Sequence, residues 1–374
     1  MGGPVRARPS GSRTMTDIPV NLGSRSYRIQ VAAGALGTVG AELAKLRVGR
    51  KAVLVSDPMV GRLHGEPVAR SLQTAGFDLV RLSVPEGEQA KQLETARETW
   101  DHLLDAGCDR TSTVVALGGG AVGDLAGFVA ATYMRGMNFV QVPTTLLAQV
   151  DASIGGKTAI DHPRAKNLIG VFHQPRLVIV DPLVLTTLPE REFRSGLAEV
   201  IKHGIVLDAS YFEDLEAHVP ALLGRDLTTL ERVVAGSCRL KARVVERDEQ
   251  EAELRWVLNY GHTVGHALEA ATGFRHWAHG EAVSLGIAAA ARLAERLGIG
   301  SSAVTKRQLS LLAAVGLPVA GIQVEPTAVV EALSRDKKSR DGRLPFVFAP
   351  EIGSFRLLSD VPREAVLEVL KDLV

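Results

Sequence analysis

Residues 113–124, TVVALGGGAVGD, decide the fold. The first five residues have the apolar, β-branched character of a buried strand, and they run directly into Gly118, Gly120 and Gly123. These glycines satisfy the pattern G-x-G-x-x-G ahead of an apolar helix. Without Cβ atoms, the loop lets phosphate oxygens reach backbone amides at a helix N-terminus, where the dipole favours negative charge. The stretch predicts a dinucleotide-binding loop in a parallel sheet, and the alternative is a tight structural turn.

Two features depart from the ordinary dinucleotide fingerprint. The loop follows the third expected strand rather than the first, and the next strand, NFVQVPTT, does not end in an acidic residue. Polar residues after other strands are candidates for the missing contacts, because open α/β sheets bind ligands at the carboxyl ends of their strands. These candidates are Asp57, the loop Glu86, Gly87, Glu88, Gln89 and Lys91, and the pair Thr144 and Thr145.

Strand and helix patterns alternate on both sides of this loop. Strands are expected at residues 51–56, 77–84, 113–117, around 140–142 and at 177–180, with helices at 66–74 and 93–106. This alternation predicts right-handed crossovers and a parallel sheet covered on both faces. From about residue 189 helical patterns dominate, at 191–206, 227–246, 261–271, 280–297 and 305–314. We therefore predict an α/β N-terminal domain with a parallel-rich, Rossmann-like sheet and a mainly α-helical C-terminal domain.

The domain boundaries follow from this change of pattern. The α/β domain is expected to cover residues 15–190 and the helical domain residues 191–374, with a ligand cleft between them. Residues 1–14 are basic and rich in Gly, Pro and Ser, without the apolar core of a signal peptide. We interpret them as a disordered tail, with Met15 as an alternative start.

Composition limits the possible partners and compartment. The 43 Lys and Arg residues balance 42 Asp and Glu residues, and a formal net charge of +1 gives no support for nucleic-acid binding. Two cysteines are too few for a disulfide framework or a thiolate zinc site, and they fit a reducing compartment, the cytoplasm. The longest apolar stretch, residues 282–294, is too short to cross a membrane.

Histidines are concentrated in one short region. His262 and His266 stand four residues apart, on one face of an expected helix. The metalloprotease pattern HExxH is excluded because Thr263 occupies the glutamate position. A catalytic zinc site takes three protein ligands and keeps one open position. Spacing alone selects His262 and His266 as the ligand pair; further candidates are His276, His279, Glu199, Glu269 and Glu281.

Several basic residues lie in polar, glycine-bearing motifs. Lys157 follows two glycines, as in the tail of a Walker A loop, but Asp151 stands where that loop needs glycine, which disfavours a P-loop NTPase. A lysine in this position remains a good phosphate contact, and the alternative for each basic residue is a solvated surface. The set is Lys157, Lys166, Lys202, Lys241, Arg255, Lys337 and Lys338.

Taken together, these motifs resemble the 3-dehydroquinate synthase family of sugar phosphate cyclases. The resemblance covers about residues 50–340 in the family's order. It rests on ALGGGAVGDLAGFVAATYMRG, QVPTTLLAQVDASIGGKTAIDHPRAKNLIG, LPEREFRSGLAEVIKHGI, LNYGHTVGHALEA, HGEAVSLGI and RDKK. It implies a phosphate-eliminating lyase that binds NAD and zinc or cobalt and forms a homodimer.

The implied reaction belongs to the shikimate pathway of aromatic amino acid biosynthesis. It converts 3-deoxy-D-arabino-heptulosonate 7-phosphate, a small phosphorylated sugar acid, to 3-dehydroquinate and phosphate. By resemblance it proceeds through transient oxidation by NAD, β-elimination of phosphate, reduction and intramolecular aldol closure.

The resemblance also implies roles for individual residues. It makes Glu199, His262 and His279 the metal ligands, which moves His266 from ligand to a neighbouring catalytic residue. It gives His203 no role. Arg135 is expected to reach the phosphate in the neighbouring subunit of the dimer. The remaining substrate and catalytic residues are Asp151, Lys157, Asn167, Lys202, Lys241, Arg255, Asn259 and either Lys337 or Lys338. NAD contacts are Asp57, Glu86, Gly87, Glu88, Gln89, Lys91, Gly119, Gly120, Gly123, Asp124, Thr144, Thr145, Lys157, Lys166, Leu185, Thr186 and Thr187.

Three other functions are compatible with the sequence. Another sugar phosphate cyclase would act on a neutral sugar phosphate, whereas Arg255 and Lys241 favour a substrate carboxylate. A metal-dependent polyol dehydrogenase of the glycerol dehydrogenase type would transfer hydride without releasing phosphate. A non-catalytic nucleotide or metal sensor is disfavoured because the candidate ligands and Lys157 are all present.

Overall fold

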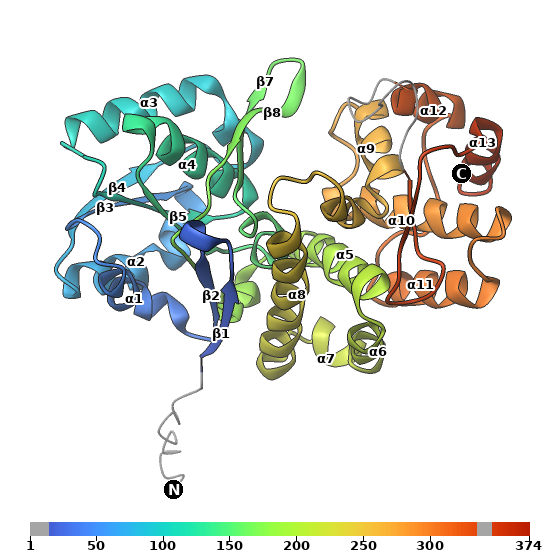
Figure 1. Ribbon diagram of the computed structural model, residues 1–374, viewed down its shortest axis with the longest axis horizontal. Coiled ribbons are helices and arrows are strands. Elements are labelled where there is room, and N and C mark those ends of the chain that lie inside the picture. The colour runs from blue at the N-terminus through green and yellow to red at the C-terminus, as the bar shows by residue number, and fades with distance from the viewer. Residues whose placement is uncertain (1–14, 335–345) are drawn as a thin grey trace, which may run out of the picture.

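The structure is a computed structural model that describes residues 15–334 and 346–374. The predicted tail at residues 1–14, and Lys337 and Lys338, lie outside the described residues. Figure 1 shows two lobes, one built around a sheet and one built from helices, with α8 (Leu227–Arg247) between them.

The first lobe is organised by a seven-stranded sheet with the order β1-β2-β9-β6-β5-β3-β4. All neighbours in the sheet are parallel except the edge pair β1 and β2. The strands are β1 Thr16–Val20, β2 Tyr27–Val31, β3 Lys51–Ser56, β4 Asp78–Ser83, β5 Thr113–Gly118, β6 Asn138–Pro143 and β9 Leu177–Val180. The strand that precedes the glycine loop, β5, therefore lies in the interior of the sheet.

Helices cover both faces of this sheet, as the continuous apolar strands require. On β3, Val53 and Val55 pack with one helix layer, while Ala52 and Leu54 pack with the layer on the opposite face. The first layer is α3 Leu93–Asp105 and α4 Gly120–Thr132, and the second is α1 Val39–Lys45 and α2 Pro58–Thr74. A hairpin of β7 Lys157–His162 and β8 Ala165–Phe172 stands apart from the main sheet (Figure 1).

The second lobe consists mainly of helices. These are α5 Glu190–Leu207, α6 Ala209–Ala217, α7 Val219–Leu223, α8, α9 His262–Ala271, α10 His279–Arg296, α11 Ser302–Ala314, α12 Pro326–Ser334 and α13 Arg363–Lys371. One short antiparallel pair, β10 Phe346–Phe348 and β11 Arg356–Leu358, joins them. This arrangement confirms the predicted fold class.

One hydrophobic core runs across the predicted domain boundary. Ile29 and Val178 of the sheet belong to the same buried cluster as Leu197 of α5 and Val234 of α8. The boundary predicted after residue 190 falls in the first turn of α5, and the division into two domains stays a prediction. A separate cluster holds α9, α10, α12 and α13 together. Within the described residues, no helix is both long enough and apolar enough to cross a membrane.

Candidate functional site

The predicted metal ligands come from three helices that meet at one point. Glu199 lies within α5, while His262 and His279 are the first residues of α9 and α10. The Nε2 atoms of His262 and His279 lie 3.5 and 3.7 Å from Glu199 Oε1. Their ligand atoms all fall within 4.8 Å of one another. Two imidazoles and one carboxylate are a donor set typical of a catalytic zinc site.

A buried carboxylate oxygen without a hydrogen-bond partner in the described part of the chain makes this cluster suited to binding a cation. Glu199 is fully buried, and its Oε1 has no hydrogen-bond partner among the described residues. Burial alone would raise the pKa of Glu199, but Lys202, His262 and His279 outweigh burial and hold the pKa well below its usual value. The pKa of His279 reaches about 10, because its interactions with the nearby carboxylates of Glu199 and Glu269 outweigh burial. A metal at this point would therefore release a proton from His279 as it binds.

His266 lies beside the same ligands. Its ring centroid is 5.2 Å from that of His262 and 6.3 Å from that of His279. A second group of possible ligand atoms, from His266, Glu269 and His279, is also compact but more exposed. The structure thus gathers all three histidines, and the fully buried carboxylate favours the set with Glu199.

Glycines allow α9 and α10 to approach closely enough to form this cluster. A Cβ at Gly286 of α10 would lie 1.9 Å from the carbonyl oxygen of Gly261, the residue before His262. Gly261 itself has φ of +77°, a conformation that favours glycine. Gly280, directly after His279, faces the backbone of Ser195 in the same way, with a Cβ distance of 2.0 Å.

The glycine loop occupies the turn between β5 and α4. Gly119 precedes the first turn of α4, which begins at Gly120. Gly123 is needed for packing, because a Cβ there would lie 2.7 Å from the side chain of Gln141 on β6. Thr144 follows β6, and its Oγ1 is buried without a hydrogen-bond partner among the described residues. Its backbone N–H donates to Gly118 at 2.9 Å, so an unsatisfied polar atom lies beside the loop.

An ionic cluster around the buried ammonium group of Lys91 joins the loop at residues 86–91 to the start of α4. Lys91 donates to Asp124 at 2.7 Å and also contacts Asn167, which places this predicted substrate residue among the predicted NAD contacts. Lys166 donates to Glu88 at 3.0 Å. Burial raises the pKa of Asp124 to about 6. Burial alone would lower the pKa of Lys91, but Asp124 and nearby carboxylates raise it.

Other predicted nucleotide contacts have structural roles of their own. Asp57 caps α2 by accepting from the N–H of Val60 at 2.8 Å, and Thr145 Oγ1 accepts from the N–H of Ala148 at 3.1 Å. Thr187, at the end of the 3-10 helix Pro182–Thr187 that also holds Leu185 and Thr186, bonds His64 Nε2 at 2.9 Å. Their contacts with NAD stay predictions.

The predicted substrate residues form a third cluster next to Glu199. Lys241 donates to both the backbone oxygen and the Oδ1 of Asp151 at 2.5 Å, and Lys202 contacts Glu199. Burial lowers the pKa of Lys241 to about 8. Arg255 is only 2% exposed and donates to the carbonyl oxygen of Gly155 at 3.1 Å. Cations and carboxylates thus alternate beside the predicted metal site.

Glu251 is a member of this cluster that the sequence analysis missed. Its carboxylate forms an ion pair with Lys157 and accepts from Asn259 Nδ2 at 3.3 Å. Both partners are predicted substrate residues. A signal was present in RDEQEAELR, residues 247–255, where carboxylates are concentrated just before Arg255.

Arg135 is not part of any of these clusters. It lies on an exposed turn, Tyr133–Arg135, with a left-handed φ of 66°.

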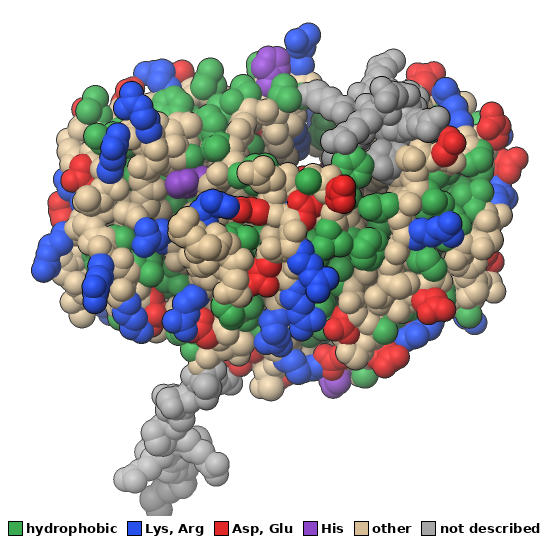
Figure 2. All heavy atoms as spheres, in the orientation of Figure 1, with side chains coloured by type: hydrophobic (Ala, Val, Ile, Leu, Met, Phe, Trp, Pro, Cys, Tyr) green, Lys and Arg blue, Asp and Glu red, His purple; other side chains and the backbone are tan. Residues whose placement is uncertain are grey.

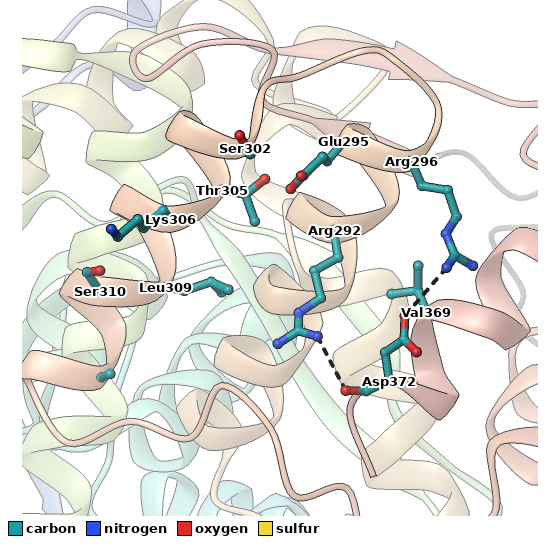
Figure 3. A pocket seen from close by; sticks show the side chains of 11 residues that line it. Arg292, Glu295, Arg296, Ser302, Thr305, Lys306, Leu309, Ser310, Val369 and Asp372 are labelled. Atoms are coloured by element: carbon teal, nitrogen blue, oxygen red, sulfur yellow. Dashed lines mark hydrogen bonds and ion pairs between the residues drawn. The ribbon is translucent and has the colours of Figure 1, made fainter.

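A surface hollow of about 680 Å³ lies between α10, α11 and α13, where Arg292 and Arg296 point towards Asp372 (Figure 3). This hollow contains none of the predicted site residues. On the face in Figure 2, Lys and Arg are interspersed with Asp and Glu, in line with the small net charge.

Most of the chain matches two models of one protein family. Residues 81–195 match the family model for the N-terminal part of 3-dehydroquinate synthase, and residues 196–339 match the model for its C-terminal part. The chain belongs to the 3-dehydroquinate synthase family.

Relatives in this family are similar over almost their whole length. The 3-dehydroquinate synthase of Geotalea uraniireducens is 51% identical over 92% of this chain and 95% of its own. That of Pelotomaculum thermopropionicum is 50% identical over 95% of this chain and 96% of its own. The predicted activity, that of a 3-dehydroquinate synthase and phosphate-eliminating lyase, is confirmed.

Solved structures show the same fold. The 2-epi-5-epi-valiolone synthase of Streptomyces hygroscopicus, with NAD+ and Zn2+ bound, has a TM-score of 0.85 and 28% identity over 98% of this chain and 99% of its own. A 2-deoxy-scyllo-inosose synthase complexed with carbaglucose-6-phosphate, NAD+ and Co2+ has a TM-score of 0.88 at 24% identity, over 96% of this chain and 100% of its own. A probable glycerol dehydrogenase from Sinorhizobium meliloti shares the fold more distantly, with a TM-score of 0.65 at 16% identity, over 91% of this chain and 94% of its own.

Proposed function

We propose that this 3-dehydroquinate synthase binds NAD at the glycine loop and a divalent metal, zinc or cobalt, at Glu199, His262 and His279. The observation that carries the metal proposal is the fully buried, unsatisfied Oε1 of Glu199, which both histidines face within 4 Å. The unsatisfied Oγ1 of Thr144 beside the loop supports the nucleotide proposal. The valiolone synthase relative carries the same two groups.

The cofactors have distinct chemical tasks. When bound, NAD supplies a transient acceptor for hydride, and the metal supplies a Lewis acid that lowers the pKa of a coordinated hydroxyl. We propose that the imidazole of His266, beside both ligand histidines, would accept the proton of the substrate hydroxyl that is oxidised and return it on reduction.

The basic residues are suited to the anionic ends of 3-deoxy-D-arabino-heptulosonate 7-phosphate. Arg255 offers a buried, rigid fork for a carboxylate. Lys241, held by Asp151, and Lys202 bring ammonium groups to the same cluster. In the structure, Lys157 and Asn259 contact the carboxylate of Glu251. The substrate must therefore displace this carboxylate or bind beside it. Holding the substrate from both ends would keep the reacting C–H bond aligned with the phosphate that leaves.

The proposal extends to the assembly and the compartment of the protein. We infer a homodimer in which Arg135, exposed on its turn, reaches the phosphate in the neighbouring subunit. We also infer a cytoplasmic location, because both cysteines, Cys108 and Cys238, are buried free thiols.

Phosphate release from the proposed substrate tests this function. The protein, supplied with NAD, should release inorganic phosphate without accumulating NADH, and a chelator should abolish the release. Glu199→Gln should lower the rate by more than the roughly 10–100-fold typical of outer residues around a metal. NADH accumulation without phosphate would instead indicate a polyol dehydrogenase. Equal rates with a chelator or with Glu199→Gln would refute the metal proposal.

A further inference from the structure

His203 is a buried histidine that the proposed chemistry does not use. It lies on α5 directly after Lys202 and has no exposed surface. Its Nδ1 is 2.6 Å from Ser237 Oγ on α8, whereas its Nε2 is buried without a hydrogen-bond partner among the described residues. Buried polar atoms are almost always satisfied in folded proteins, so this nitrogen calls for an explanation.

Neighbouring hydroxyls identify the tautomer of the ring. Tyr211 donates its only hydroxyl proton to the carbonyl oxygen of Val233 at 2.8 Å. Burial raises the pKa of Tyr211, and a hydrogen bond from Ser237 opposes this rise. We infer that Ser237 gives its single proton to Tyr211, so that its oxygen accepts from Nδ1–H of His203. Burial, together with Lys202, lowers the pKa of His203 to about 3, so the ring is neutral and Nε2 carries a lone pair.

The surroundings of the ring determine what can satisfy that lone pair. A ring nitrogen of His203 lies within 4.8 Å of carboxylate oxygens of Asp151 and Glu199. We place no second metal at these three side chains, because Glu199 is already a ligand of the proposed site. Both carboxylates are paired with lysines, Asp151 with Lys241 and Glu199 with Lys202. Ionised carboxylates have no proton to donate. The nearby hydrogen-bond donors are the ammonium groups of these two lysines, whose charges both act on His203.

Lys202 is the ammonium group that needs a second acceptor. It contacts Oε2 of Glu199, the carboxylate proposed to bind the metal. A divalent cation at Glu199 repels the ammonium group, and a buried ammonium without an acceptor is costly. Lys241 is different, because it already donates to two oxygen atoms of Asp151.

We propose that His203 is a positioning residue that accepts a hydrogen bond from Lys202 when a divalent metal takes Glu199. Ser237 and Tyr211 fix the ring so that Nε2 is the acceptor. The proposal rests on the proposed metal site, and it adds a reason why that site tolerates a lysine three residues from one of its ligands.

Zinc titration of the metal-stripped protein by calorimetry tests this proposal. His203→Asn keeps an N–H that can reach Ser237 but removes the Nε2 acceptor. It should weaken Zn²⁺ binding about tenfold, as expected for losing one hydrogen bond to a charged group. Lys202→Met should bind Zn²⁺ at least as tightly as the unaltered protein, and adding His203→Asn to it should cause no further loss.

The controls separate the possible failures. His218→Asn, at an exposed histidine after α6, should leave zinc affinity unchanged. If Glu199→Gln leaves zinc affinity unchanged, the proposed metal site is wrong. If Glu199→Gln weakens binding but His203→Asn does not, or if His203→Asn weakens it equally in the Lys202→Met protein, the proposal for His203 is overturned.

Nitrogen NMR of ¹⁵N-histidine-labelled protein provides a readout independent of metal and activity. The Nδ1 atoms of His102, His218 and His262 also face backbone carbonyl oxygens, so several Nδ1–H signals are expected. One neutral Nδ1–H signal among them, that of His203, should be missing in His203→Asn. Ser237→Ala, which removes the acceptor for Nδ1–H, should change its tautomer or broaden its signals. A neutral Nε2–H tautomer for His203 would contradict the inference, even if His203→Asn proved too unstable for titration.

Discussion

Gly286→Ala tests how the close contact between α9 and α10 builds the proposed metal site. The new Cβ would lie 1.9 Å from the carbonyl oxygen of Gly261, and Cβ atoms essentially never come within 3.0 Å of a neighbouring atom. The helices must therefore separate by about 1 Å, because the obstacle is backbone rather than a flexible side chain. Gly261 directly precedes His262, so the movement is passed to a proposed ligand.

Both stability and metal affinity should fall, for different reasons. Overpacking of this kind costs about 1–3 kcal/mol, and each kcal/mol lowers the unfolding temperature of a domain of this size by roughly 2–4 °C. Metal–ligand distances tolerate only about 0.2 Å, so a shift near 1 Å should reduce zinc affinity more than tenfold.

Thermal unfolding and zinc calorimetry measure the two effects. Gly65→Ala is the matched control, since Gly65 lies inside α2 and an added Cβ would meet no atom within 4 Å. This control should leave zinc affinity unchanged and stabilise the protein by about 0.4–1 kcal/mol. Unfolding and zinc binding of Gly286→Ala that match the unaltered protein would refute the reasoning.

Two further predictions concern the substrate cluster. Because burial lowers the pKa of Lys241 to about 8, its ammonium charge is lost above that pH. In a steady-state pH profile, kcat/KM should therefore fall about tenfold per pH unit above pH 8. A flat profile up to pH 10 would contradict a substrate-binding role for Lys241. Gly155 has a φ of +96°, and the Cβ added in Gly155→Ala would lie 2.2 Å from Arg255 Nη2. We expect this strain to displace Arg255 and raise KM for the substrate at least about tenfold, while Gly65→Ala leaves KM unchanged. An unaltered KM in Gly155→Ala would show that Arg255 does not bind substrate.

The parts of the fold with a strong hydrophobic pattern could be predicted from the sequence. The expected strand at residues 51–56 is β3, and the helix expected at 227–246 is α8 within one residue at its C-terminal end. The β7–β8 hairpin was missed because it stands apart from the main sheet, and the apolar residues of β8, Leu168, Ile169, Val171 and Phe172, are exposed rather than part of a buried strand pattern. The pair β1 and β2 was missed as well, since its place in the sheet depends on β9, far along the chain.

Local sequence patterns could predict only some of the residues in the candidate site. The spacing of His262 and His266 indicated a shared helix face, but it could not show which carboxylate another helix would bring to that face. Glu199 reaches the histidines through packing of α5 against α10, which is a tertiary effect. The resemblance supplied this residue, and the structure places it within 4 Å of both proposed ligand histidines. Glu251 escaped both approaches because Lys157 is distant in sequence and Glu251 itself lies in an irregular segment between α8 and the 3-10 helix Leu254–Asn259.

The positions of these ligands in two hydrophobic cores have a mechanical consequence. Neighbours of Glu199 on α5, such as Leu197 and Val200, belong to the core that includes the sheet. Val264 and Leu268, which follow His262 on α9, belong to the separate core of the C-terminal helices. A metal held by Glu199 and His262 would therefore link two packing units that also meet along α10 and β10. Binding energy at the site would then resist their separation, so occupancy of the metal site and the position of the helical lobe relative to the glycine loop should be coupled.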